Sequence, residues 1–345
     1  MVNMNLKSIT ISIFVFASTL IFGGLANAGT AIDGKEYKNT IPVTEKNYTD
    51  VEAEFNFLKW KKKDAMNKLF HLTQLTPAGV MPTIRMNRDT LYSAALVDAT
   101  NGFTVHMPDQ GIFTSVLVLD QKGYAQDYIW RRGTHKVTID TKNGDFVWIL
   151  FRIGLEEGIE KALEAQKTVA ISDMGKKVWT PKNYDLNQYQ ALHDAYMQEA
   201  IDSGMFLQYG FSASRIDNKT KRLSDAAGWG GMDFGINNYQ ISKNMSGDSC
   251  YSTTFEDPLA DEFWSFTLYD ADGWLLPVNE KNVLNSRDAV ANKDGTYTVR
   301  FNCGKNAINN LQTKEKVFGF AWRTYGSSYK VKSGQWNPIN SLVKE

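Results

Sequence analysis

The densest group of chemically capable side chains lies within eight residues, at the start of a strand-rich region. It consists of Arg85, Asn87, Arg88, Asp89 and Tyr92. The planar guanidinium of arginine pairs in a bidentate manner with carboxylate or phosphate groups. An aspartate that is shielded from water can act as a general base. We therefore predict that Arg85, Asn87, Arg88 and Tyr92 bind a small polar or anionic ligand and that Asp89 is the catalytic candidate.

The same five residues are also consistent with a buried structural cluster, in which Asp89 caps a turn and pairs with Arg88. Strand geometry limits how many of them can face one ligand. If residues 88–93 are extended, Arg88 and Tyr92 point to one side and Asn87 and Asp89 to the other. We expect Arg85, Asn87 and Asp89 to share a face.

A second group of candidates lies in the last third of the chain. Arg323 and Tyr325 alternate onto one face of a predicted strand and are expected to complete the site. Trp264 is included as a ligand contact, although core packing explains an apolar tryptophan equally well. Asp270-x-Asp272-Gly273 resembles the start of a calcium loop but lacks its later acidic ligands, so turn chemistry accounts for both aspartates.

Nucleophile and metal motifs are weak. Short serine patterns surround Ser212, Ser249 and Ser327, but none has the full Gly-x-Ser-x-Gly form. The histidines are scattered without metal-ligand spacing: His71, His106, His135 and His193. No nucleotide-binding fingerprint is present. A serine esterase therefore stays an alternative, and no metal and no cofactor are expected.

Helices and strands must position these residues. Thr49-x-x-Glu52 fits a capping box and opens an amphipathic stretch. Residues 83–152 carry short apolar and β-branched runs, and Asn143-Gly144 predicts a hairpin between residues 135–140 and 145–151. Helices are expected at residues 155–166 and 186–206.

The remaining chain contains a loop-like region followed by a second strand-rich region. Residues 210–250 are rich in Gly, Ser and Asn and are expected to have little regular structure. Strands return at residues 262–269, 296–301 and 317–325, with turns between them. The predicted fold class is mainly β with a few helices (α+β), in which two β-sandwich or jelly-roll-like parts are joined by a helical and Gly-rich connector. The predicted divisions are a signal peptide (1–28), an extended arm (29–48), a first β domain (49–170), the connector (171–250) and a second β domain (251–345).

The run Asn87-Arg88-Asp89-Thr90-Leu91-Tyr92-Ser93 resembles the signature of the bacterial family called domain of unknown function 1254. Asp98 and Met107-Pro108-Asp109 continue that resemblance. The run from Phe263 to Gly273 is similar to the companion domain of unknown function 1214, as are Asn279, Asp294-Gly295 and Arg323-x-Tyr325. The resemblance covers roughly residues 45–330 and implies a two-part, mostly β protein that is often exported. It implies no reaction.

The N-terminus has the three parts of a secretory signal peptide. Lys7 supplies the positive charge, residues 9–22 supply an apolar run, and Ala26-Asn27-Ala28 supplies the small residues that signal peptidase reads. The run is shorter than the ~20 residues that span a bilayer. We predict cleavage after Ala28 and an exported protein, periplasmic or secreted, with no membrane span in the mature chain.

The charge balance argues against one class of binding partner, and the two cysteines indicate a disulfide. The chain has 38 Lys+Arg and 38 Asp+Glu, so no basic field is available to hold nucleic acid. The two cysteines, Cys250 and Cys303, are expected to form a disulfide in an oxidising compartment, and two buried free thiols are the alternative.

Three hypotheses for function follow from these features. The leading hypothesis is an exported protein that binds a small polar or anionic ligand, and one form of it has a carbohydrate-like ligand. It includes the option that the protein acts on this ligand by carboxylate acid/base chemistry. The second is a non-catalytic envelope or interaction protein that forms a homo-oligomer. The third is the serine esterase.

Overall fold

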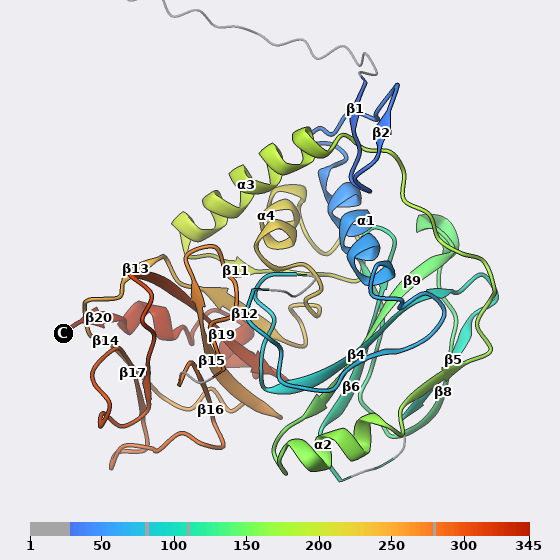
Figure 1. Cartoon of the computed structure of the whole chain (residues 1–345). Helices are drawn as coiled ribbons and strands as arrows, with labels where there is room; N and C mark the ends of the chain where they lie inside the picture. The colour runs from blue at the N-terminus through green and yellow to red at the C-terminus, as the bar shows by residue number, and fades with distance from the viewer. Residues whose placement is uncertain (1–27, 80–82, 108, 110, 279–280) are drawn as a thin grey trace, which may run out of the picture.

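The computed structural model describes residues 28–79, 83–107, 109, 111–278 and 281–345. Two β-rich parts lie side by side, and helices α1, α3 and α4 gather at one end of their junction (Figure 1). The prediction of a mainly β fold with a few helices is confirmed. Residues 1–27 of the expected signal peptide, Pro108 and Asn279 lie outside the described residues.

The first β part consists of a five-stranded sheet, in the order β3-β4-β9-β6-β7, and a three-stranded sheet, in the order β10-β5-β8. All strand pairs in both sheets are antiparallel. The strands are β3 (Phe70–Leu72), β4 (Thr90–Asp98), β5 (Phe103–Met107), β6 (Thr114–Asp120), β7 (Ala125–Ile129), β8 (Gly133–Val137), β9 (Phe146–Gly154) and β10 (Ala170–Ser172).

Both faces of the five-stranded sheet are buried, because its apolar residues do not alternate with polar ones. On β4, Leu91 and Ala95 pack with the three-stranded sheet and helix α2 (Ile159–Gln166). Tyr92, Ala94 and Leu96 point to the opposite face, toward the second β part and the helices. Every residue of β4 is therefore buried.

The second β part pairs a six-stranded sheet, β11-β12-β19-β15-β16 with β13 also on β19, with a four-stranded sheet, β18-β17-β14-β20. Its strands are β11 (Phe206–Leu207), β12 (Asn238–Ile241), β13 (Met245–Ser246), β14 (Tyr251–Phe255), β15 (Phe263–Asp270), β16 (Val283–Asn285), β17 (Tyr297–Phe301), β18 (Asn310–Leu311), β19 (Val317–Tyr325) and β20 (Val343–Lys344). On β19, Phe320 and Trp322 fill the core between these two sheets. Ala321, Arg323 and Tyr325 point the other way, toward the first β part.

The helices close the open end of the junction between the two parts (Figure 1). They are α1 (Tyr48–Lys61), α3 (Leu186–Ser203) and α4 (Asn218–Gly228), while the short α5 (Tyr329–Lys332) and the 3-10 turns Thr141–Asn143 and Pro338–Ser341 lie elsewhere. One apolar core joins all these elements, with Trp60 from α1, Trp148 from β9 and Tyr239 from β12. Among the described residues, no helix is long and apolar enough to cross a membrane.

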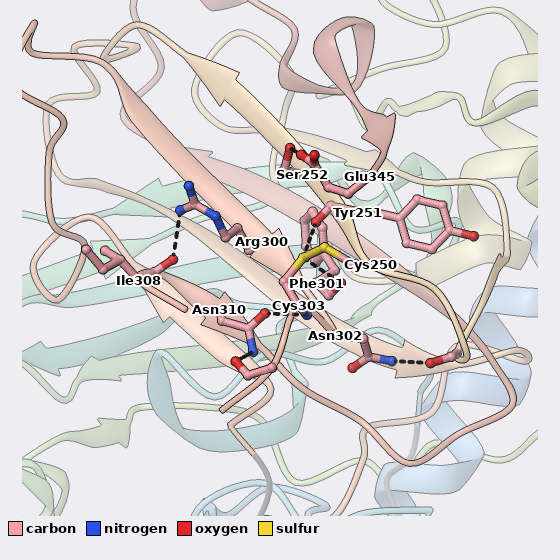
Figure 2. The surroundings of a disulfide bond; sticks show 12 residues. Cys250, Tyr251, Ser252, Arg300, Phe301, Asn302, Cys303, Ile308, Asn310 and Glu345 are labelled. Atoms are coloured by element: carbon pink, nitrogen blue, oxygen red, sulfur yellow. Dashed lines mark hydrogen bonds between the residues drawn. A yellow bond between two sulfur atoms is a disulfide. The ribbon is translucent and has the colours of Figure 1, made fainter. Parts of the chain in front are cut away.

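The predicted disulfide between Cys250 and Cys303 is confirmed. Cys250 directly precedes β14, and Cys303 follows β17 by one residue, so the bond joins the ends of two paired strands (Figure 2). The nearby Asn310 side chain accepts a hydrogen bond from the backbone N–H of Cys303 at 2.9 Å. The bond therefore closes a loop of 53 residues at one edge of the second β part.

The predicted hairpin around Asn143-Gly144 is wrong. β8 and β9 belong to different sheets, because β9 pairs with β4 and β6 on its two sides and has no free edge for β8. β8 pairs with β5 instead. Between the two strands, the Asp140 side chain caps a 3-10 turn by accepting from the backbone N–H of Lys142.

Two further expectations need correction. Glu52 does not form a capping box, because its carboxylate is buried and accepts hydrogen bonds from Tyr48 and Tyr189. Residues 210–250, expected to have little regular structure, contain α4 and two strands of the six-stranded sheet, β12 and β13. The residues of the expected extended arm form a small β1–β2 hairpin (Gly29–Thr30 with Glu36–Tyr37), and Ile32 is buried against α1 and α3.

Candidate functional site

The segment from Arg85 to Asp89 is not extended, since β4 begins only at Thr90. Arg85 has a φ of 53°, in the left-handed region, and its backbone N–H donates to the carbonyl of Gly273 at 2.9 Å. The strand alternation expected for this segment therefore does not apply before Thr90. The chain turns here, and the side chains take directions that alternation does not predict.

A cavity of about 60 Å³ lies beside this segment, at the junction of the two β parts. Its wall is built from three arginines, four tyrosines, three tryptophans and a glycine-rich backbone. These residues are Arg85, Arg152, Arg323, Tyr92, Tyr209, Tyr239, Tyr325, Trp60, Trp148, Trp229, Gly228, Gly230 and Gly231. Clefts between domains are a common position for small-molecule sites, so this cavity is the candidate functional site.

Five of the predicted site residues meet at this cavity: Arg85, Asn87, Tyr92, Arg323 and Tyr325. They come from segments more than 230 positions apart in the sequence. The Asn87 side-chain amide donates to the hydroxyl of Tyr325 at 2.6 Å. The expected meeting of the first cluster with the last strand therefore occurs.

Arg88, one of the predicted ligand contacts, does not line the cavity. Its guanidinium donates to the carbonyls of Thr76 and Leu276 and to the side-chain oxygen of Asn282. All three acceptors are protein groups, and none belongs to Asp89. Arg88 thus ties the Arg85–Asp89 segment to both β parts.

Asp89, the catalytic candidate, lies behind the cavity wall and is buried. Oδ2 accepts a hydrogen bond from the Ser265 hydroxyl at 2.7 Å, and Oδ1 has no partner among the described residues. Burial raises the pKa of Asp89 because the charged carboxylate is poorly solvated there. The expected shared face of Arg85, Asn87 and Asp89 is therefore wrong for Asp89, whereas Tyr92, expected on the other face, lines the cavity.

Trp264 points away from the cavity. It lies on the face of β15 that packs against the four-stranded sheet, where it contacts Phe255 and Tyr297. Its side chain is fully buried in that core. The structure therefore supports the core-packing interpretation of this residue, not a sugar platform.

Arg152 is the cavity residue that the sequence analysis missed. It is 7% exposed and lies on β9, directly between Tyr92 of β4 and Ser115 of β6. One terminal nitrogen donates to the carbonyl of Gly230 at 3.1 Å, and the other, Nη1, is buried without a partner among the described residues. A signal was available, because Arg152 is the one charged residue in the apolar run of β9.

The other two arginines of the cavity are held by protein groups. Arg323 Nη2 donates to the carbonyl of Arg85 at 2.7 Å and to the hydroxyl of Tyr269 at 2.6 Å. Arg85 Nη1 donates to the carbonyl of Ala227 at 2.6 Å. Burial lowers the pKa of Arg85 to about 10, and the Arg323 cation acts in the same direction.

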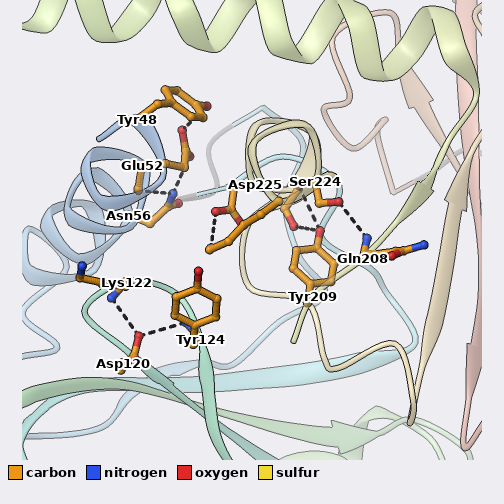
Figure 3. A network of polar contacts seen from close by, with 12 residues as sticks. Tyr48, Glu52, Asn56, Asp120, Lys122, Tyr124, Gln208, Tyr209, Ser224 and Asp225 are labelled. Atoms are coloured by element: carbon orange, nitrogen blue, oxygen red, sulfur yellow. Dashed lines mark hydrogen bonds and ion pairs between the residues drawn. The ribbon is translucent and has the colours of Figure 1, made fainter. Parts of the chain in front are cut away.

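Tyr209 braces the helical side of the cavity (Figure 3). Its hydroxyl donates to the carbonyls of Ser224 and Gly228, at the end of α4. A Cβ on Gly231 would lie 2.0 Å from the Tyr209 ring, so the backbone can pass here only as glycine. This close approach brings the carbonyl of Gly230 within reach of Arg152.

The charged side chains of the cavity wall are all positive among the described residues. Three arginines line it, and among the described residues no aspartate or glutamate does. A buried cation normally pairs with an anion, and an unpaired one is unfavourable. The wall therefore has an excess of positive charge and of hydrogen-bond donors.

A separate buried network surrounds Glu52 on α1 (Figure 3). The carboxylate accepts from Tyr48, Tyr189 and the Asn56 amide and lies 3.0 Å from His193 Nδ1. Burial alone would raise the pKa of Glu52, but the nearby His193 outweighs it and brings the pKa to about 2. This network joins α1 to α3 and lines no part of the cavity.

The serines of the esterase alternative are not paired with histidine. The Ser212 hydroxyl bonds to Ser214, and the Ser327 hydroxyl bonds to Thr324. In the part of the chain that the structure describes, no histidine hydrogen-bonds to Ser212, Ser249 or Ser327. A Ser–His pair of the kind that activates a serine nucleophile is thus absent at these three positions.

Comparison with known proteins agrees with the architecture. Residues 236–329 match the family described as "Protein of unknown function (DUF1214)", which confirms that part of the resemblance. The structure of the VPA0106 protein from Vibrio parahaemolyticus is similar, with a TM-score of 0.61 and 17% identity, over 87% of this chain and 97% of that one. An uncharacterised protein from Burkholderia cenocepacia has a TM-score of 0.49 and 14% identity, over 82% and 85% of the two chains. No curated protein matches.

Proposed function

We propose that this chain is a binding protein for a small anion, which it holds in the cavity between its two β parts. The observation that carries the proposal is Arg152, whose Nη1 is buried in the cavity wall and has no partner among the residues that the structure describes. Leaving a buried cationic N–H unpaired disfavours the folded state by ~1–3 kcal/mol or more. Such a group is well explained when an anion supplies the missing acceptor.

The rest of the wall supports an anion and not a cation. Arg85 and Arg323 add positive potential, although their own N–H groups already bind protein carbonyls. Burial lowers the pKa of Arg85, which means that its charged form is short of solvation. An anion in the cavity would give Arg152 Nη1 an acceptor and would offset the poor solvation of the Arg85 cation.

The wall supports binding more strongly than acid/base catalysis. Asp89, the carboxyl proposed for that chemistry, lies outside the cavity lining and bonds to Ser265. The remaining titratable groups of the wall are arginines and tyrosines, and burial raises the pKa of Tyr209 and Tyr325 well above the usual range. These phenols stay protonated at neutral pH and serve as hydrogen-bond donors.

We further propose that the chain is exported and resembles domain of unknown function 1254 through its first β part. The N-terminal pattern of charge, apolar run and Ala26-Asn27-Ala28 supports export, and a disulfide agrees with an oxidising compartment. Expression of the full chain followed by cell fractionation and N-terminal sequencing tests this. A mature protein that starts at Gly29 outside the cytosol is expected, and an unprocessed cytosolic product would contradict it.

A thermal-shift screen of the purified chain against carboxylates, phosphate, sugar acids and neutral sugars tests the binding function. A ligand present at a hundred times its Kd should add ~2.7 kcal/mol of stability. Arg152→Met should abolish the shift, because it removes the arginine nitrogen of the cavity wall that is buried without a partner among the described residues. Arg131→Met, which removes the same charge from an exposed turn, is the matched control and should keep the shift. A shift that survives Arg152→Met, or an anion screen with no shift at all, would overturn the proposal.

A further inference from the structure

The size of the cavity restricts the ligand. Its volume is about 60 Å³, and a cavity needs ~10–15 Å³ of such space to hold one water molecule. The space therefore matches a ligand with a few non-hydrogen atoms. A sugar ring with its hydroxyl groups has more non-hydrogen atoms than that, so we favour a smaller ligand than the carbohydrate-like one considered from the sequence.

The supply of hydrogen-bond donors restricts the charge of the ligand. Of the three arginines, Arg323 is bound to the Arg85 carbonyl and to Tyr269, and Arg85 is bound to Ala227. Arg152 is the one whose terminal nitrogen lacks a partner among the described residues. Three indole N–H groups of the wall, from Trp60, Trp148 and Trp229, are also buried without a partner among the described residues. These donors are neutral, so the one unpaired guanidinium nitrogen matches a monoanion, whereas a phosphate dianion needs several charged donors.

Along β9, an aliphatic and an aromatic side chain of the cavity wall lie next to Arg152. Leu150 and Trp148 precede Arg152 at alternate positions of β9, and all three side chains line the cavity. Alternate residues on one strand face are ~7 Å apart. Leu150 is thus the nearer apolar neighbour of Arg152 along this strand face, and Trp148 lies beyond it.

We propose, on the basis of the binding function above, that the ligand is a compact aliphatic monocarboxylate of about the size of acetate or propionate. Its carboxylate accepts from Arg152 Nη1, and its alkyl group packs on Leu150 and Trp148. Arg152 selects the charge, and the small volume excludes longer acids. Burial at 7% exposure keeps the guanidinium out of bulk water, where competing solvation would weaken the contact.

Gly228 offers a way to change the cavity volume without a clash. A Cβ at this position would meet Arg85, Leu207 and Tyr209 atoms at 3.6 Å, which is ordinary van der Waals contact. All three neighbours line the cavity. Gly228→Ala therefore removes cavity space and leaves the charge of the wall unchanged.

Isothermal titration calorimetry of the full purified chain with formate, acetate, propionate, hexanoate, glucuronate, phosphate and acetamide tests the proposal. Acetate and propionate should bind, while hexanoate, glucuronate and the neutral isostere acetamide should not. Arg152→Met should weaken acetate binding roughly 10- to 100-fold, as expected for loss of a hydrogen bond to a charged group. Arg152→Lys, which keeps the charge without the planar fork, should give an intermediate affinity. Gly228→Ala should weaken propionate more than acetate.

The outcomes separate this proposal from the broader one. If phosphate or glucuronate binds in an Arg152-dependent manner and acetate does not, the monocarboxylate is wrong and the anion-binding function stands. If no anion binds the wild-type chain, or if binding survives Arg152→Met with the folded state verified by circular dichroism, both proposals fail. Equal binding of acetate and acetamide would also overturn both, because charge would then play no part.

Discussion

Arg152 and Arg88 are each 7% exposed as whole residues, but their guanidinium groups are used differently. Arg88 donates to three protein acceptors, whereas Arg152 donates to the Gly230 carbonyl and has one nitrogen without a partner among the described residues. We expect their replacement by methionine, which has a similar length and no charge, to give very different stabilities. The comparison tests whether Arg152 is held for a ligand or for the fold.

The magnitudes follow from the groups left behind. Arg152→Met leaves the Gly230 carbonyl unpaired, which destabilises by ~1–3 kcal/mol, but it also removes a buried unpaired cationic N–H of similar penalty. The net change in the free energy of unfolding should lie within ~1 kcal/mol of zero. Arg88→Met leaves three acceptors unpaired with little compensation, so a loss of ~3–5 kcal/mol is expected.

Urea unfolding followed by tryptophan fluorescence measures both variants against the wild-type chain, with the disulfide oxidised in every sample. The slope of the transition should be unchanged, so that the shift in midpoint reports stability. A loss of 3 kcal/mol or more for Arg152→Met, equal to that for Arg88→Met, would show that the ligand-free fold already uses the whole Arg152 guanidinium. The reasoning that assigns Arg152 to a ligand would then be refuted.

Three further predictions concern the rest of the chain. Burial alone would lower the pKa of His193, but the neighbouring Glu52 outweighs burial and raises that pKa. The stabilisation from protonated His193 is therefore full below pH 6.5 and is lost as pH rises through the folded-state pKa. The advantage of wild type over His193→Gln in urea melts should shrink between pH 6 and pH 9, and a constant difference would contradict this. Burial raises the pKa of Asp89 above 3.8, so wild type loses stability as pH rises from 3.8 through the folded-state pKa. The Asp89→Asn variant should be at least as stable as wild type at pH 8 and should lose this advantage near pH 4. A strongly destabilised variant at pH 8 would show that the fold needs the charged carboxylate. Reduction of Cys250–Cys303, or replacement of both cysteines by serine, should lower the free energy of unfolding by up to ~4 kcal/mol, because the bond closes a 53-residue loop. Calorimetry with and without reductant measures this change. An unchanged transition would mean that the disulfide does not form in solution.

Strand patterns and local turn chemistry were readable from the sequence. Residues 317–325 were predicted to form a strand, and the placement of Arg323 and Tyr325 on one strand face followed from the two-residue period of a strand. The turn at Asp272-Gly273 was equally local, since the Asp270 side chain accepts from the backbone N–H groups of Asp272 and Trp274. These features depend on residues within a few positions of one another, so the local sequence is sufficient.

Pairing partners were not readable in the same way. The Asn143-Gly144 dipeptide favours a hairpin, but the burial of both faces and both edges of β9 decided otherwise. Residues 210–250 have a composition typical of loops, yet β12 there pairs with β19, more than 80 positions away. Long-range sheet pairing outweighed local propensity in both cases.

The candidate site likewise combines features that the local sequence predicts with features that depend on long-range packing. Chain connectivity places Arg85, Asn87 and Tyr92 in one short segment, and the two-residue period of a strand places Arg323 and Tyr325 on one face. Long-range packing brings these groups together around one cavity, turns Asp89 and Arg88 away from it and adds Arg152 to it. The local sequence does not predict this packing, because the role of an arginine in an apolar strand depends on its acceptors, and those acceptors come from distant parts of the chain.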